Sequence, residues 1–283
     1  MSDQAPDRAA HSPAAPSGAP DARATPTVPA ATRGGSAAAA RAEYPDLRYR
    51  DVFWPGRDYE DACDRRALGA LLPPPGARRG RLLEVGAGFG RLADEYRGFD
   101  EVVLLDPSSA HLAAARERFA GQPRVRVAQG DAFDLPFEAA SVDVVVCVRV
   151  LHHFADPRPA LAEFARVLRP GGLLVLEHAN KRNLKAIVRY LLRRQAWSPF
   201  APGPAPYREV HLDHAPADVR RWLRSAGFRI EATRTASLLR WRPLSRRLPL
   251  GLLLAVERPL QAWLAPATAG PSMFLAARRR SGR

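Results

Sequence analysis

Apolar residues along this chain fall into short runs of strand length, separated by stretches in which they recur at helical spacing. Predicted strands lie at 82–85, 101–106, 125–128, 141–149, 173–177, 228–235 and 272–278. Predicted helices lie at 60–72, 91–96, 108–119, 158–168, 181–194, 216–226 and 248–264. This alternation predicts an α/β fold, a Rossmann-like, doubly wound sheet of seven mostly parallel strands that is covered on both faces.

The same pattern divides the chain into segments. Residues 1–40 are rich in Ala, Pro, Ser and Gly and show no apolar periodicity, so we expect a disordered tail. Residues 44–278 are predicted to form one domain, and a short basic tail follows at 279–283. Within the domain, residues 180–214 depart from the alternation, because a basic amphipathic helix leads into a proline-rich stretch that we expect to be a loop. We interpret 180–214 as a helical cap inserted after the fifth strand.

Charge is distributed unevenly in a chain of otherwise ordinary composition. The net charge is +14, and residues 181–283 hold 21 of the 43 basic residues but only 5 of the 29 acidic ones. Such a surface could attract an anionic substrate, an acidic lipid surface or nucleic acid, or it could be the solvated face of an arginine-rich protein. The two cysteines indicate neither a disulfide framework nor a cysteine metal site. With no run of about 18 apolar residues and no recognisable secretory signal, we expect a cytoplasmic protein.

The first predicted strand ends in a glycine-rich turn at residues 86–90. Glycines at alternate positions suit a tight turn in which the backbone approaches a ligand closely, although nucleotides, dinucleotides and plain loops all use such turns. The next strand ends at Asp106, whose carboxylate can accept hydrogen bonds from both hydroxyls of a ribose. Parallel sheets bind ligands at the carboxyl ends of their strands, where Asp131 and Glu177 are also predicted to lie. These positions indicate a nucleotide-type cofactor site.

Five motifs in order carry a resemblance to a known family. They are Leu-Leu-Glu-Val-Gly-Ala-Gly-Phe-Gly (82–90), Leu-Leu-Asp-Pro-Ser (104–108), Gly-Asp-Ala-Phe-Asp-Leu-Pro-Phe (130–137), Val-Leu-His-His-Phe (150–154) and Arg-Val-Leu-Arg-Pro-Gly-Gly (166–172). Together they resemble the class I S-adenosylmethionine-dependent methyltransferases, particularly the methyltransferase type 11 branch that includes ubiquinone and menaquinone biosynthesis enzymes. The resemblance runs from about Arg57 to Arg278 and implies transfer of a methyl group from S-adenosylmethionine to an unidentified acceptor.

The resemblance also implies roles for individual residues. Glu84 would face the ammonium group of the cofactor, Asp106 the ribose hydroxyls and Asp131 the adenine amino group. The full set of implied cofactor-binding residues is Glu84, Gly86, Ala87, Gly88, Gly90, Asp106, Pro107, Asp131, Ala132, Phe133 and Arg149, with Arg57 or Tyr59 as candidates for the cofactor's carboxylate.

Methyl transfer needs a base only if the acceptor must lose a proton. The candidates are His152, His153, Glu177 and His178, all at the mouth of the predicted sheet. A structural role within the turn is the alternative for each of them. His211, Asp213 and His214 follow in the cap, but as a metal site this group lacks further ligands at a recognisable spacing, so we predict no metal.

Two other functions compete with methyl transfer. A nicotinamide-dependent oxidoreductase is disfavoured, because dinucleotide-binding turns place the third glycine one residue later and no tyrosine has a lysine four residues on. A non-catalytic protein that binds S-adenosylmethionine would keep the same acidic positions. We expect a small-molecule acceptor, since no separate nucleic-acid module is visible. A peripheral contact with an anionic membrane surface is an alternative role for 181–194 and 248–264. The sequence does not indicate an oligomeric state.

Overall fold

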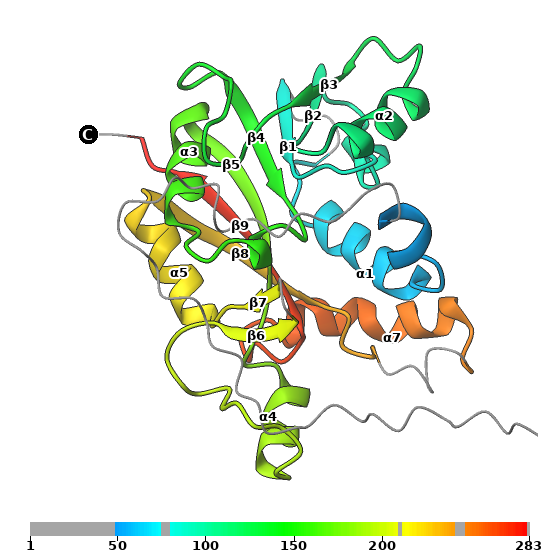
Figure 1. Ribbon diagram of the computed structural model, residues 1–283, viewed down its shortest axis with the longest axis vertical. Coiled ribbons are helices and arrows are strands. Elements are labelled where there is room, and N and C mark those ends of the chain that lie inside the picture. The colour runs from blue at the N-terminus through cyan, green and yellow to red at the C-terminus, as the bar shows by residue number, and fades with distance from the viewer. Residues whose placement is uncertain (1–48, 75–79, 209–210, 241–246, 282–283) are drawn as a thin grey trace, which may run out of the picture. The chain divides into compact units, whose positions relative to one another are not determined.

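The computed structural model describes residues 49–74, 80–208, 211–240 and 247–281. The predicted disordered tail at 1–40 and the last two residues of the basic tail lie outside this part of the chain. Seven strands form one sheet (Figure 1). Their bounds are Arg81–Val85 (β1), Glu101–Asp106 (β2), Val125–Gln129 (β3), Val142–Cys147 (β4), Leu168–Ala179 (β5), Phe228–Ala236 (β8) and Ser272–Arg279 (β9).

The sheet has the order β3-β2-β1-β4-β5-β9-β8. The first five strands pair in parallel, and β9 is antiparallel to both of its neighbours, β5 and β8. The prediction of a seven-stranded, mostly parallel sheet is therefore confirmed. The chain runs from β1 through β2 to β3 at one edge of the sheet, and it then crosses back so that β4 lies on the other side of β1. Because the strand order reverses there, a crevice opens at the carboxyl ends of β1 and β4.

Helices cover both faces of the sheet, as alternating side chains of the strands require. One face packs against α1 (Asp58–Gly69) and α7 (Leu250–Trp263), the other against α3 (Arg158–Val167) and α5 (Pro216–Ser225) (Figure 1). In β4, for example, Val146 belongs to the first core and Val145 to the second. The helix α2 (Ser109–Arg118) begins where predicted, since Ser108 Oγ accepts a hydrogen bond from the His111 amide at 3.3 Å.

The segment 180–214 contains more structure than the sequence pattern predicted. Its helix, α4 (Leu184–Leu191), is shorter than the predicted 181–194. The proline-rich stretch ends in two short antiparallel strands, β6 (Ala205–Arg208) and β7 (His211–Asp213), where we had expected only a loop. The pattern missed them because prolines and short length conceal strand character.

Helix α7, within the predicted 248–264, runs through Pro259. Its buried side chains are Leu253, Glu257 and Gln261, and two of these three are polar. Glu257 accepts a hydrogen bond from the Tyr59 hydroxyl at 2.6 Å, and the Gln261 side chain donates to the Cys63 carbonyl at 3.1 Å. Leu253 packs in the core, whereas the apolar residues Leu252, Val256 and Trp263 are exposed. Among the described residues, no helix combines the length and apolar character needed to cross a membrane.

Candidate functional site

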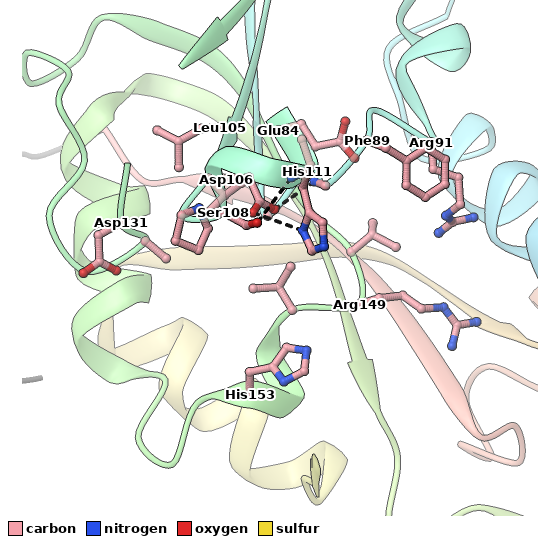
Figure 2. Close-up of a pocket in the computed structure, with 18 of the residues that line it drawn as sticks. Glu84, Phe89, Arg91, Leu105, Asp106, Ser108, His111, Asp131, Arg149 and His153 are labelled. Atoms are coloured by element: carbon pink, nitrogen blue, oxygen red, sulfur yellow. Dashed lines mark hydrogen bonds and ion pairs between the residues drawn. The ribbon is translucent and has the colours of Figure 1, made fainter. Parts of the chain in front are cut away.

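A pocket of about 490 Å³ lies at the carboxyl ends of β1, β2 and β4. We call it the glycine-loop pocket, and it is within the size range of about 300–1,000 Å³ that small-molecule sites occupy. Figure 2 shows Asp131 at one end of this pocket and Arg91 and Arg149 at the other, with Asp106, Ser108 and His111 between them. Most of the cofactor-binding residues implied by the sequence line it: Glu84, Gly86, Ala87, Gly88, Asp106, Pro107, Asp131, Ala132, Phe133 and Arg149.

Asp106, the last residue of β2, ties the glycine loop to the start of α2. One carboxylate oxygen accepts from the Gly88 amide at 2.8 Å and the other from the Ser108 amide at 2.9 Å. His111 Nδ1 lies 3.5 Å from the second oxygen. A carboxylate has about four acceptor positions. Asp106 can therefore hold the loop in place and still accept hydrogen bonds from a ligand.

Glu84 lies at the floor of the pocket and is 3% exposed. Its Oε2 makes no hydrogen bond of good geometry to any described residue. Burial raises the pKa of this carboxyl from an ordinary value near 4.5 to about 8, against the opposing attraction of the Arg91 guanidinium. A buried acceptor beside a cavity is an arrangement that a cationic ligand group would stabilise.

The glycines of the loop have different surroundings. Gly88 has φ +56° and lines the pocket, and a Cβ added there would meet nothing within 4 Å. Gly90 has φ +72°, and a Cβ there would lie 2.5 Å from a ring carbon of Phe119. Gly90 therefore lies against the core and is absent from the residues lining the pocket, and its place in the cofactor site stays a prediction.

The end of the pocket beside Asp131 has apolar walls. Ala132 and Phe133 follow β3, and the rings of Phe133 and Phe154 are 4.7 Å apart between centroids. Asp131 precedes them, and one of its oxygens accepts the Phe133 amide at 3.1 Å. Apolar walls with one carboxylate at the rim suit an aromatic ring that carries a hydrogen-bond donor.

Comparison with known proteins agrees with this geometry. The family model described as a methyltransferase domain matches residues 83–176. A probable S-adenosylmethionine-dependent methyltransferase of Mycolicibacterium smegmatis is 34% identical over 54% of this chain and 53% of its own length. A demethylmenaquinone methyltransferase of Clavibacter sepedonicus is 38% identical over 38% of this chain and 43% of its own length.

The match assigns a methyltransferase domain to residues 83–176. The relative from Mycolicibacterium smegmatis is described as dependent on S-adenosylmethionine. The chain spans about half the length of the two curated relatives named above. Among solved structures, a chain of the complex between the Haloferax volcanii Trm112 methyltransferase activator and its methyltransferase superposes with a TM-score of 0.58, at 20% identity over 83% of this chain and 97% of that one. At that identity the likeness shows the fold alone.

Two arginines line the end of the glycine-loop pocket that lies away from Asp131. Arg149 follows β4 with φ +60°, a conformation uncommon for a residue with a side chain, and its guanidinium forms two hydrogen bonds with buried Asp64 at 2.8 and 3.0 Å. Arg91 contacts the same carboxylate at 3.1 Å and lies 3.9 Å over the ring of Trp54. The sequence analysis listed Arg149 but missed Arg91, although Arg91 directly follows the last glycine of the loop.

Arg57 and Tyr59 are not among the residues that line the pocket, and their contact with the cofactor's carboxylate stays a prediction. The Tyr59 hydroxyl is buried, donates to Glu257 and accepts from the Leu239 amide at 3.0 Å. The Arg57 guanidinium lies 4.0 Å over the Phe53 ring and 3.9 Å from Glu60. Both residues hold α1 against neighbouring segments. Motif spacing alone cannot distinguish such a structural role from ligand binding.

The candidate bases separate into two groups. His153 lines the pocket and His152 is beside it in the turn η4 (Leu151–His153), where burial lowers the pKa of His152 well below its ordinary value. Glu177 is buried in β5, where it accepts from the Arg149 amide at 2.8 Å and from the Ser272 hydroxyl. His178 is also buried, and burial lowers its pKa to about 3. Neither Glu177 nor His178 lines the pocket, and a catalytic role for either of them stays a prediction.

The structure groups the cap histidines differently from the sequence. His211, at the start of β7, lies against His152 and His153, with ring centroids 4.6 and 5.2 Å away. His214 instead points to the core, where its Nε2 is 3.3 Å from the Leu151 carbonyl. Asp213 is between them in sequence, and burial raises its pKa to about 6. Linear spacing within 211–214 could not indicate this grouping, because its other members come from a turn some 60 residues earlier.

Proposed function

We propose that this protein transfers the methyl group of S-adenosylmethionine to a small-molecule acceptor by in-line displacement. The observation that carries the proposal is the row of carboxylates in the glycine-loop pocket. Glu84, Asp106 and Asp131 lie near the carboxyl ends of β1, β2 and β3, three strands that are neighbours in the sheet. A ligand that has a cation, a vicinal diol and an aromatic amine at successive positions matches that row.

Each part of the methyl donor has a complementary group in this assignment. The ammonium would neutralise Glu84, the ribose hydroxyls would donate to Asp106, and the adenine would lie against Ala132 and Phe133 with its amino group toward Asp131. The donor's carboxylate would lie near Arg91 or Arg149, the cations at that end of the pocket. Gly88 would pass close to the methionine part, in the space that its missing side chain leaves open.

The chemistry then depends mainly on alignment. The methyl group is already bound to a positively charged sulfur, and an acceptor atom held in line with the carbon–sulfur bond can displace it. Positioning of this kind can supply about 7–11 kcal/mol of the reduction in barrier. His153 faces the pocket and is the residue placed to orient the acceptor or to accept its proton.

The acceptor can be sought directly. Cell extracts with and without the protein would be compared by mass spectrometry, and candidates would then be incubated with purified protein and isotopically labelled methyl donor. We expect a product heavier than its precursor by one CH₂ unit. A folded protein that binds the donor but transfers no label across extracts and a broad acceptor panel would favour the non-catalytic binding protein instead.

The outer faces of α4 and α7 favour a peripheral contact with an anionic lipid surface, which we propose as the setting of the reaction. On α7 the exposed apolar residues Leu252, Val256, Pro259 and Trp263 recur at helical spacing, and Trp263 is 74% exposed. On α4, Leu184, Val188, Leu191 and Leu192 are exposed. The two helices are joined, because the Leu184 amide donates to the Ala269 carbonyl at 2.9 Å, five residues beyond the end cap of α7.

Positive charge accompanies these apolar faces. Lys185 and Arg189 lie on α4, and Arg193 and Arg194 follow it. An apolar stripe flanked by cations matches the chemistry of an anionic bilayer surface.

Vesicle sedimentation tests the membrane contact. The protein should co-sediment with phosphatidylserine-containing vesicles at low salt and less with neutral vesicles, and Trp263→Ser together with Leu252→Ser should release it. The matched control is Trp222→Ser, on α5 at the opposite face of the sheet. Equal sedimentation with and without vesicles, or no effect of the double substitution, would contradict the contact.

A further inference from the structure

We infer that His152, His153 and His211 form a site for a divalent transition-metal ion at the acceptor side of the glycine-loop pocket. These three residues are the histidine cluster. One ring nitrogen from each can be chosen so that all three lie within 4.8 Å of one another. All three side chains are partly exposed, so an ion can enter from solvent. The arrangement joins two parts of the fold, the turn after β4 and the hairpin of the cap.

The ring geometry is close to that of a three-histidine site. A zinc–nitrogen bond of about 2.0–2.1 Å and near-tetrahedral angles place three ligating nitrogens roughly 3.3 Å apart and the ring centroids about 5 Å apart. The observed centroid distances are 4.1, 4.6 and 5.2 Å. Small rotations of the side chains would bring the nitrogens onto one ion.

The backbone around the cluster is fixed on both sides. The His153 amide donates to the Val150 carbonyl at 2.9 Å, which closes the turn that holds His152 and His153. On the cap side, the His214 amide donates to the Ala179 carbonyl at 3.0 Å, and His214 Nε2 lies 3.3 Å from the Leu151 carbonyl. This second contact anchors the end of β7 directly onto the turn that holds His152 and His153. Ligands held on rigid backbone are what a defined metal geometry requires.

The donor set indicates which ion fits. Imidazole nitrogens suit Zn²⁺, Fe²⁺, Ni²⁺ and Cu²⁺ and are poor ligands for Mg²⁺ and Ca²⁺, which take oxygen. Three protein ligands leave at least one coordination position open, the pattern of catalytic zinc sites. Since His153 also lines the glycine-loop pocket, the open position lies beside the place where the methyl group would be presented.

The role of the ion rests on the proposed function. With His153 as a ligand of the ion, an acceptor hydroxyl bound at the open position would lose its proton to solvent instead of to His153, because the metal lowers the pKa of the hydroxyl. Its oxygen would then form a bond to the methyl carbon while the carbon–sulfur bond breaks and its electron pair goes to sulfur. The products are the methyl ether and neutral S-adenosylhomocysteine. The metal supplies no electrons and is not consumed.

The experiment uses the full chain without a polyhistidine tag, stripped with a chelator and titrated with Zn²⁺ in a calorimeter. We expect one equivalent to bind, and Co²⁺ in its place should give the visible absorption of a low-coordinate nitrogen site. His211→Gln or His152→Gln should weaken binding by more than about 100-fold, since loss of partners outside the ligand shell alone costs about 10–100-fold. The matched control is His111→Gln, which lies in the pocket but outside the cluster and should keep the wild-type affinity.

Two further measurements separate the possible failures. His211→Gln should retain wild-type affinity for S-adenosylhomocysteine and the wild-type unfolding temperature, which excludes misfolding as the cause of lost metal. No saturable binding by folded wild-type protein, or binding equal in His111→Gln, His152→Gln and His211→Gln, overturns the site. Metal binding without methyl transfer keeps the site and counts against the proposed function, whereas transfer at the same rate in chelated and zinc-loaded protein overturns the role of the ion.

Discussion

At the scale of single residues, the buried carboxyl of Glu84 suits a cationic ligand group but lowers the stability of the ligand-free protein as pH rises toward 8. Its carboxyl is buried with a pKa of about 8, compared with about 4.5 in an unfolded chain. Below pH 4.5 both states are protonated and the contribution to stability is complete. As pH rises from about 4.5 to 8, the unfolded chain releases the proton before the folded one does, so the free energy of unfolding falls. A bound cation would relieve this cost by stabilising the ionised carboxylate.

Glu84→Gln should therefore be more stable than the wild type, with a difference that grows from about pH 5 to pH 8 toward a few kcal/mol in order of magnitude. The same substitution should weaken binding of S-adenosylmethionine, because the amide cannot neutralise its ammonium. Denaturant unfolding at several pH values and calorimetry of the ligand check the two effects.

The control for Glu84 is Glu163→Gln on α3. Hydrogen bonds from Arg166 lower the pKa of Glu163, so its contribution to stability is present above the ordinary pKa of a glutamate and is lost as pH falls through the lowered value. This control should be slightly less stable than the wild type at pH 5–8 and should bind the ligand normally. A Glu84→Gln protein that is less stable than the wild type at pH 8 would contradict the assigned ionisation.

At the scale of elements, the glycine loop makes two different demands on its glycines. Gly88→Ala places a methyl group in open space within the pocket. It should lower the free energy of unfolding by about 1–2 kcal/mol, the cost of an alanine in the left-handed conformation, and it should weaken cofactor binding. Gly90→Ala adds a clash with Phe119, and overpacking adds a further 1–3 kcal/mol or so to the same conformational cost. Urea unfolding and ligand calorimetry on the pair check this. Equal stability of the two variants, or undiminished affinity in Gly88→Ala, would argue against the loop geometry.

The elements also indicate how far a sequence pattern determines this fold. The buried parallel strands were predicted closely, because runs such as 102–105 and 144–148 must be apolar on both faces. β6 and β7 were missed because both are short and β6 contains Pro206, and their pairing depends on partners that periodicity cannot identify. α7 continued through Pro259 because contacts such as Tyr59–Glu257 hold it on the body of the domain, and tertiary contacts of that kind outweigh local propensity.

The same reasoning explains which site residues were predicted. Glu84, Asp106 and Asp131 lie at or near the carboxyl ends of predicted strands, so topology alone brings them to one edge of the sheet. Arg57 and Tyr59 were assigned from a resemblance, and only packing shows that their side chains are used elsewhere. The histidine cluster joins residues 152, 153 and 211, and a contact across nearly 60 residues leaves no periodic trace in a single sequence.

At the scale of the whole described domain, the two halves of the sheet divide the work. The strands before residue 150 build the glycine-loop pocket, and the segment after β5 supplies the cap, α7 and the basic, apolar outer surface. β9 links the two halves, because it lies between β5 and β8 and its Ser272 donates to Glu177, which in turn accepts the Arg149 amide.

The central claim is that the glycine-loop pocket binds S-adenosylmethionine, and calorimetric titration of the full chain with that ligand tests it most directly. The wild type should bind one equivalent. Asp106→Ala should keep its fold and bind about 10- to 100-fold more weakly, since it loses charge-assisted hydrogen bonds both to the ribose and to the loop that presents it. No saturable binding by the folded wild type, or an affinity that Asp106→Ala leaves unchanged, would contradict the account.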